Sequence, residues 1–267
     1  MTRTRGDAAL GHAALGLAVL LAGCGLVGAE PGTVPPSSAV GEPAAPEPPD
    51  PEPTTASHVR AQGTPDVRLA GVTVHLPDDG VREVVRASDA DGERWTLTPS
   101  GDRTDRLLLL LAAPEGADLR LHDDGSVLLV PLEPAAPDGL GLAPLTTGTL
   151  ELLAPDLLAV RADPAAPDAA VDLRFGRTAV ASATWGEAEG GRSLAVVPTA
   201  WARAAGEAGT ELVWQHVQAV AGDEATPGMH DQLVCHGLGA PDKASWNLEP
   251  WRPDVGLAAT LLALCNP

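Results

Sequence analysis

The feature that most limits what this chain can fold into is a proline-rich stretch from Gly25 to about Pro65. It holds ten prolines among alanine, serine, threonine, glycine and a few acidic residues, without apolar periodicity. Such a composition cannot bury enough apolar surface to offset the entropy lost on ordering, and dense proline favours extended polyproline II at about 3.1 Å per residue. We therefore predict a disordered tether over residues 24–65 and a folded part in residues 66–267. A proline-rich ligand for a partner domain is the alternative for this stretch.

The first 23 residues have the pattern of an export signal. Arg3 and Arg5 give a positively charged start, and the segment Ala13–Ala22 is apolar. A membrane-spanning helix needs roughly 20 apolar residues to cross about 30 Å of hydrocarbon, whereas the core of a signal peptide needs only about 7 to 15. Residues 1–23 are therefore predicted to be a signal peptide.

The end of this segment, Leu21-Ala22-Gly23-Cys24, resembles the lipobox of bacterial lipoproteins. The resemblance implies cleavage before Cys24 and fatty acyl chains, such as palmitate, attached to that residue. Each buried methylene contributes about 0.8 kcal/mol, so several acyl chains make a stable anchor. It thus predicts an extracytoplasmic protein that the lipid on Cys24 holds at the cell membrane. An ordinary cleaved signal followed by an unrelated cysteine is the alternative.

The charge balance argues against a nucleic-acid partner. The chain carries 36 acidic and 17 basic residues, a formal net charge of −19, and its one lysine is Lys243. Nucleic-acid binding draws its affinity from clustered lysine and arginine, and the arginines here are scattered. An acidic balance of this kind mainly indicates solubility.

Residues 66–181 are predicted to form a mainly β, sandwich- or barrel-like domain. Short alternating or apolar runs recur between turn signals, as in such folds, and D-D-G loops indicate hairpins. The predicted strand runs are Val67–Leu76, Leu119–His122, Ser126–Leu132, Thr149–Leu153, Leu157–Arg161, Ala170–Phe175 and Ala179–Trp185.

Two segments of this region are ambiguous. The leucines Leu107–Leu111 fit a buried strand or part of a helix equally well. The sequence 89–92 (DADG) suggests a calcium loop, but an EF-hand alignment puts Ala87 at the first ligand position and Thr98 at the glutamate position. We therefore interpret residues 89–92, like Asp123-Asp124, as turns.

Residues 182–267 are predicted to form a small α+β domain with one disulfide. A strand pair flanks Gly190-Gly191, a helix begins at Pro198-Thr199, and Thr210 is the expected N-cap of a helix over 211–221. The inward face of that helix is expected to carry Val213, Trp214, Val217 and Val220, and Leu257–Leu264 is a last short helix. The segment 230–236 is left open between strand and helix.

The two remaining cysteines, Cys235 and Cys265, form an even pair once Cys24 is taken as the anchor. In an exported protein such a pair is expected to be oxidised. The bridge closes a loop of about 30 residues, which stabilises a fold by about 3 to 4 kcal/mol in the loop-entropy model. A free redox thiol or a metal ligand is the alternative, although neither has C-x-x-C spacing.

Two long motifs in the last 80 residues carry a family resemblance. They are residues 229–236 (MHDQLVCH) and Lys243 followed by 246–254 (WNLEPWRPD), together with the ending 265–267 (CNP) and the upstream residues 193–196 and 198–201. These motifs resemble an uncharacterised domain family at the C-terminus of secreted and lipid-anchored proteins of high-GC Gram-positive bacteria. The family has no known function, so the resemblance implies no activity.

The polar residues of this segment are the candidate site. Catalytic candidates are His230, His236, Lys243, Glu249 and Arg252, whose types serve acid–base work and oxyanion support; Asp231, Asn247 and Asp254 are further polar candidates. The same residues suit a structural network: Glu249 can pair with Arg252, Asn247 can cap a turn before Pro250, and Trp246 and Trp251 can pack against the bridge.

No metal or cofactor is predicted. The two histidines lie about 20 Å apart in a strand and about 120° apart around a helix, so they cannot hold one metal alone. His230-Asp231 resembles the pair of secreted phospholipases A2, but the cysteine three residues earlier and the calcium loop of those enzymes are missing. The chain also contains no G-x-S-x-G elbow.

Two functions fit these residues. The first is a non-enzymatic surface module that binds a cell-envelope ligand or protein. The second is an extracytoplasmic hydrolase or toxin-like enzyme that uses His230 or His236 with Lys243, Glu249 or Arg252. Convergence of these side chains on an open cleft favours the enzyme, and internal pairing favours the module. The sequence does not indicate an oligomeric state.

Overall fold

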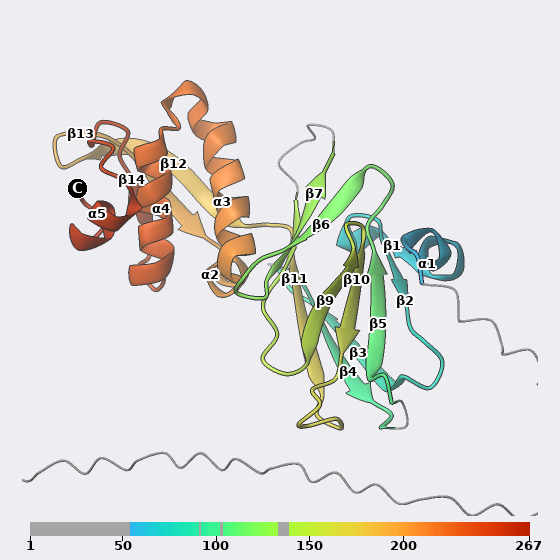
Figure 1. Ribbon diagram of the computed structural model, residues 1–267. Helices are drawn as coiled ribbons and strands as arrows, with labels where there is room; N and C mark the ends of the chain where they lie inside the picture. The colour runs from blue at the N-terminus through green and yellow to red at the C-terminus, as the bar shows by residue number, and fades with distance from the viewer. Residues whose placement is uncertain (1–53, 91, 102–103, 133–138) are drawn as a thin grey trace, which may run out of the picture. The chain divides into compact units, whose positions relative to one another are not determined.

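The computed structural model describes residues 54–90, 92–101, 104–132 and 139–267 (Figure 1). These residues belong to one compact unit. The predicted signal peptide, Cys24 and most of the predicted tether lie outside the described residues. Within the described part of the chain, no helix combines the length and apolar character needed to cross a membrane.

The first region consists of two antiparallel sheets. The five-stranded sheet has the order β1 (Thr64–Asp66), β2 (Val72–His75), β5 (Leu107–Ala112), β10 (Leu157–Arg161) and β9 (Thr149–Ala154). The six-stranded sheet has the order β3 (Val81–Ser88), β4 (Gly92–Pro99), β11 (Val171–Gly176), β8 (Leu140–Leu142), β7 (Val127–Pro131) and β6 (Ala117–Leu121). The prediction of a mainly β region is confirmed.

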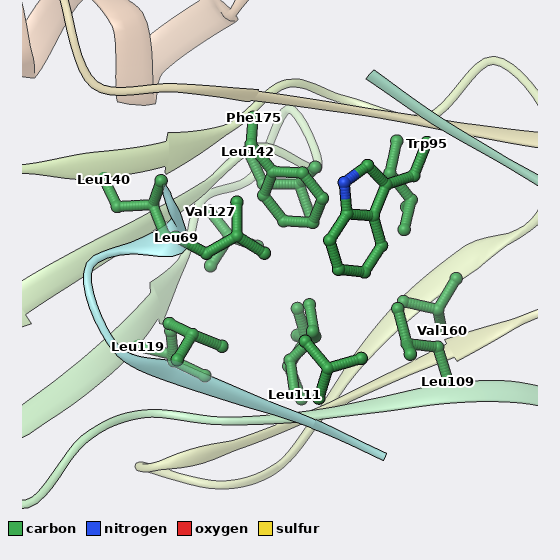
Figure 2. Packing of buried hydrophobic residues seen from close by; sticks show 14 of the residues in the cluster. Leu69, Trp95, Leu109, Leu111, Leu119, Val127, Leu140, Leu142, Val160 and Phe175 are labelled. Carbon is green, nitrogen blue, oxygen red and sulfur yellow. The ribbon is translucent and has the colours of Figure 1, made fainter. Parts of the chain in front are cut away.

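A single apolar core lies between these sheets (Figure 2). Leu109 and Leu111 enter it from the five-stranded sheet, and Trp95 and Phe175 enter it from the six-stranded sheet. The two aromatic rings meet edge to face, with their centroids 5.4 Å apart. Because both sheets bury one face in the same core, the region is a β-sandwich.

Helix α1 (Ala56–Gln62) covers the outer face of the five-stranded sheet. Ala56 and Val59 pack there against Leu110 and Ala112. Strand β5 is therefore buried on both faces, which explains why its leucines show no alternation. The strand alternative for Leu107–Leu111 is confirmed.

Ordered structure begins earlier than the sequence indicated. Helix α1 and the first two residues of strand β1 lie within the range predicted as tether. The helix is ordered there because Thr55 caps it and Arg60 binds the neighbouring sheet. The Arg60 guanidinium donates to the Ala113 carbonyl at 2.7 Å and to Asp156 at 3.0 Å. The predicted run Val67–Leu76 is also interrupted, since residues 67–69 form a 3-10 turn before β2.

The second region is a three-stranded antiparallel sheet covered by helices. The strands are β12 (Val180–Ala188), β13 (Gly191–Pro198) and β14 (Trp246–Leu248), in that order. The helices are α2 (Ala200–Ala204), α3 (Gly206–Ala221), α4 (Pro227–Gly239) and α5 (Leu257–Leu262), with a 3-10 turn at Gly222–Glu224. The Cys235–Cys265 disulfide ties α4 to the residues after α5, with Cα atoms 5.5 Å apart. The predicted α+β fold with one disulfide is confirmed.

Helix α3 begins five residues before the predicted start. Asp124 and Ser126, on the turn between β6 and β7, supply its caps: Glu207 N donates to Asp124 Oδ2 at 2.7 Å, and Ala208 N donates to Ser126 Oγ at 3.0 Å. Thr210 therefore lies inside the helix and donates to the Gly206 carbonyl. The prediction of Thr210 as N-cap is wrong, because the cap comes from a distant strand turn.

Helix α2 packs against the six-stranded sheet through one tryptophan. Trp201 is buried, and its ring lies where a Cβ at Gly141 or Gly176 would stand. Its indole N–H donates to the Arg174 carbonyl at 2.9 Å. Thr199 caps α2 at the predicted position. Together with the Asp124 cap, this contact joins the sandwich to the helices.

Candidate binding groove

A groove of about 580 Å³ opens beside helices α3 and α4. Its volume falls within the roughly 300–1,000 Å³ typical of ligand sites. The lining residues are His122, Asp124, Ala202, Arg203, Gly206, Glu207, Thr210, Glu211, Trp214, His230, Val234, Gly237, Leu238 and Trp246. We refer to this space as the α3–α4 groove; the two helices can be followed in Figure 1.

One face of α3 forms the first wall. Its lining residues Glu207, Thr210, Glu211 and Trp214 follow a spacing of three, four and seven, which is one stripe of a helix. Trp214 is half-buried and meets the His230 ring edge to face, with centroids 4.8 Å apart. The face with Val213 and Val217 is buried instead. The expected inward packing is confirmed in part for Trp214, which packs against the core and also lines the groove, and is wrong for Val220, which is 40% exposed.

Helix α4 forms the second wall of the groove. Residues 230–236, for which the sequence allowed a strand or a helix, are therefore helical. His230, Val234, Gly237 and Leu238 lie on the groove side at offsets of four, seven and eight. Leu238 is 69% exposed and lines the groove from this helix.

Gly237 keeps the groove open between its walls. A Cβ at this position would lie 3.5 Å from Thr210 Oγ1 and 3.8 Å from the edge of the Trp246 ring. Both distances are ordinary van der Waals contacts. A side chain here would fit without a clash but would occupy groove space.

Charged groups gather at the end of the groove where α3 begins. Arg120 Nη1 donates to both carboxylate oxygens of Glu211, at 2.9 and 3.1 Å. His122 lies between two acids, with Nδ1 3.3 Å from Glu207 and Nε2 3.8 Å from Glu211. The Glu207 carboxylate is 58% exposed, and within the described part of the chain His122 is its only ion-pair partner.

Asp124 anchors this end of the groove. Burial raises the pKa of its carboxyl, but hydrogen bonds from Ser126 Oγ, Ser126 N and Glu207 N outweigh burial and lower that pKa below its usual range. The carboxylate therefore stays ionised, which suits its place at the positive end of helix α3. Gly206 has a φ of +62°, and a Cβ there would clash with the Asp124 carboxylate.

One arginine that lines the groove already binds backbone carbonyls of the protein. Arg203 donates to the carbonyls of Pro198 at 3.1 Å, Pro241, and Ala244 at 3.3 Å. Its guanidinium also lies 5.3 Å from the centroid of the Trp246 ring. These contacts use most of its donors, so Arg203 holds the α4–β14 connection in place.

Two of the predicted catalytic residues are instead paired inside the fold. Arg252 Nε donates to Glu249 Oε2 at 2.5 Å, and the guanidinium also binds Glu189 and the Pro267 carbonyl. Burial lowers the pKa of Arg252, and its bonds to Glu249 and Glu189 raise it by more, so the guanidinium stays charged. The Glu249 side chain is 2% exposed.

Gln232 completes this buried network from helix α4. Its amide donates to the Glu249 carbonyl at 3.1 Å and accepts from Glu249 N at 2.9 Å. Ser193 Oγ donates to Glu249 Oε1 at 3.4 Å from strand β13. The network therefore joins α4, β13 and the chain end. The expected local pair of Glu249 and Arg252 is confirmed as part of it.

His236 is a buried histidine on the inner side of α4. It is 3% exposed, and Nε2 lies 3.3 Å from the Asn247 carbonyl. Burial lowers the pKa of this imidazole, Lys243 lowers it further, and the bond to Asn247 opposes both. Nδ1 is buried without a hydrogen-bond partner among the described residues. Protonation would thus place a donor where no acceptor lies.

The other predicted residues do not join a common cleft. Lys243, Asn247 and Asp254 are exposed and Asp231 is half-buried. Asn247 lies in β14 and accepts from Ser245 Oγ, so the predicted cap before Pro250 is not formed. His230 is the one catalytic candidate among the residues that line the groove.

The two tryptophans differ in their burial. Trp246 is 2% exposed and stacks on His236, with centroids 6.4 Å apart. Trp251 is 46% exposed and covers Gly191 at the β12–β13 turn, so its predicted burial against the bridge is wrong. Throughout the ranges that the structure describes, no three His, Cys, Asp or Glu side chains are arranged to hold a metal ion.

Sequence reasoning missed most of the groove. Of the α3 stripe, Trp214 was assigned to the inward face and Thr210 to the N-cap, and Asp124 was assigned to a turn with no further role. The offsets of four, seven and eight in 230–238 are the signal that could have shown the α4 wall, once that segment was taken as a helix.

Comparison with known proteins finds a similarity to one family over part of the chain and indicates no activity. Residues 180–267 match the model of a family described as "Protein of unknown function (DUF2599)". An uncharacterized protein of Mycobacterium tuberculosis is 40% identical over 93 residues, which cover 32% of this chain and 61% of that protein. An uncharacterized protein of Mycobacterium leprae is 41% identical over 58 residues, or 20% of this chain and 47% of that protein.

The matches therefore span less than two thirds of the length of these relatives. No solved structure matches this chain. The predicted resemblance to an uncharacterised domain family is confirmed for residues 180–267. The family segment holds α3, α4 and the buried network, whereas His122 and Asp124 lie before it.

Proposed function

We propose that this protein is a non-enzymatic binding module of the cell envelope, held at the membrane by lipid on Cys24, and that the α3–α4 groove is its ligand site. The observation that carries the proposal is the split between the two sides of helix α4. The inner side is committed to the core through Gln232 and His236. The outer side leaves Leu238 and His230 facing an open groove.

The alternative of a hydrolase or toxin-like enzyme requires the candidate side chains to meet. Glu249 and Arg252 are instead bound to each other, and His236 is buried against a backbone carbonyl. A general base must reach a substrate proton within about 3 Å or through one water. A binding role fits these positions better than catalysis does.

The proposed membrane anchor is supported by two features of the sequence. The lipobox-like residues 21–24 and the proline-rich segment after them suit a folded body held away from the bilayer. Labelled palmitate should be incorporated into the wild-type protein and not into a Cys24→Ala variant, which should appear in the medium. An unlabelled wild-type protein that is free in the medium contradicts the anchor.

The groove is tested with the released Cys24→Ala chain and isolated cell-wall material of the producing bacterium. Leu238→Asp puts a charge on the groove wall and should lower the sedimented fraction at least tenfold. Leu262→Asp is the matched control, because Leu262 is 87% exposed on α5, outside the groove. Equal binding by both variants, or loss of binding only in the control, contradicts the proposal.

A further inference from the structure

We infer that the α3–α4 groove takes a small cationic ligand, in which an ammonium or guanidinium group is joined to an apolar body. This inference rests on the proposed function, because it names the chemistry of the ligand at the same site. It depends on which charged side chains at the groove already bind protein partners and which remain accessible to a ligand.

The arginine that lines the groove, Arg203, and the arginine beside it, Arg120, are both bound to protein partners. Arg120 makes a two-oxygen contact with Glu211. Arg203 donates to three backbone carbonyls and lies over Trp246. A ligand carboxylate or phosphate would have to displace these contacts, and hydrogen bonds to a charged group are stronger than those between neutral groups.

The carboxylates at the same end are more open. Glu207 is 58% exposed and contacts His122, and Glu211 is 33% exposed beside it. Asp124 adds a third ionised carboxylate to this end, whereas Arg120 is the one arginine that pairs there within the described residues. The positive end of helix α3 offsets about half a charge. Arg120 and a protonated His122 offset one charge each, so the three carboxylates still leave the open end of the groove negative.

The rest of the groove offers an apolar surface. Trp214 on α3 and Val234 and Leu238 on α4 line it. Gly237 has no side chain to fill the space between them. A tryptophan ring and carboxylates in one groove suit a cation that carries an apolar group, because aromatic rings attract cations and pack against apolar groups. The volume of about 580 Å³ suits a small ligand.

Glu207 also has a structural explanation, since acidic residues in the first turn stabilise a helix. A structural role predicts that Glu207→Gln changes thermal stability and leaves the charge preference of the groove unchanged. The charge preference of binding is therefore the quantity to measure.

Three probes of one shape make this measurement: 2-phenylethylamine, 2-phenylethanol and 3-phenylpropionate. Each is titrated into the Cys24→Ala full chain, and the indole N–H signals of Trp214 and Trp246 are followed by proton–nitrogen correlation spectra. We expect the amine to bind at least tenfold more tightly than the alcohol and the carboxylate, and salt to reduce this difference. An acetylated Lys-Leu amide presents the same chemistry from a peptide, so its affinity relative to the amine separates a peptide source from a free amine.

Two substitutions locate the effect. Glu207→Gln should remove most of the tenfold preference and leave the alcohol affinity unchanged, whereas Glu224→Gln, whose carboxylate pairs with Arg192 outside the groove, should change neither. Gly237→Leu should block all probes, because its side chain extends into the groove beside Thr210 and Trp246.

The outcomes separate this inference from the proposed function. Equal binding of all three probes with Trp214 shifts, or tighter binding of the carboxylate, overturns the cationic class and keeps the groove as a site. Absence of any shift with the amine at millimolar concentration also overturns the cationic class. The proposed function falls separately if Leu238→Asp leaves the binding to cell-wall material unchanged.

Discussion

The two sides of helix α4 each carry a histidine, but their side chains have different partners. Inward, Gln232 and His236 bind the backbone of β14 and of the residue after it, and Cys235 forms the bridge. Outward, His230 and Leu238 face a groove. The side richer in chemically versatile residues is the structural one. Polar residue type alone therefore does not locate a site; the partners of each side chain do.

The largest expected effect concerns the buried network. Arg252→Ala leaves the Glu249 carboxylate buried without its cation, and breaking such a pair costs about 3–5 kcal/mol. Urea denaturation of the full chain measures the loss.

Arg192→Ala is the matched control for this variant. Its pair with Glu224 has side chains 53% and 42% exposed, so its salt bridge is worth only about 0–1 kcal/mol. A loss below about 1 kcal/mol for Arg252→Ala would show that the buried network around Glu249 is not structural and would reopen the catalytic hypothesis.

The disulfide should give the next largest effect. The bridge closes a segment of 30 residues that includes β14 and α5, for which the loop-entropy model gives about 3–4 kcal/mol. Replacing both cysteines with serine should lower the free energy of unfolding by that amount. A reductant should destabilise the wild-type protein and leave the double variant unchanged; equal sensitivity of the two contradicts the assignment.

His236→Ala should cost about 2 kcal/mol or more, because a buried ring that stacks on Trp246 is removed. His58→Ala, at an exposed position of α1, should change stability by less than about 0.5 kcal/mol. A negligible loss for His236→Ala would instead place this histidine in a site.

His236 also sets the sign of a pH effect. Its pKa is lowered on folding, so the unfolded chain binds the proton more readily. The stabilisation is complete above the ordinary histidine pKa of about 6.5 and is lost as the pH falls from there through the lowered value. Wild-type stability should therefore fall more steeply below about pH 6.5 than that of His236→Gln. Identical pH profiles would refute the assignment.

The smallest effects are expected on the groove side. Gly237→Ala should raise stability by up to about 1 kcal/mol, because alanine is the better helix former and its Cβ meets only ordinary contacts. The same change should weaken ligand binding. Gly239→Ala, at the end of α4 with nothing nearby, is the control that should leave binding intact. A destabilised Gly237→Ala would mean that the groove is packed shut.

Much of the fold could be predicted because its patterns are local. Alternation marks β11, and Thr199 caps α2 at the predicted position. The start of α3 could not be predicted, since Asp124 reaches it from 83 residues away. The leucines of β5 were undecidable because α1 and the sandwich core bury opposite faces.

The candidate site was harder to predict for a physical reason. Glu249, Arg252 and His236 are residue types that often serve in catalytic sites. In the folded protein, however, they are buried and bound to protein partners. The groove combines a helix stripe containing Trp214 with a strand turn containing His122. Only tertiary packing brings those two segments together.

The central claim is that the outer side of α4, and not the inner side, meets the ligand. Carboxyl footprinting by mass spectrometry, with and without bound cell-wall material, tests it directly on the Cys24→Ala chain. The account predicts that Glu207 and Glu211 become protected while Glu189 and Glu224 keep their reactivity. Protection of Glu189 and Glu224, with Glu207 still reactive, would contradict it.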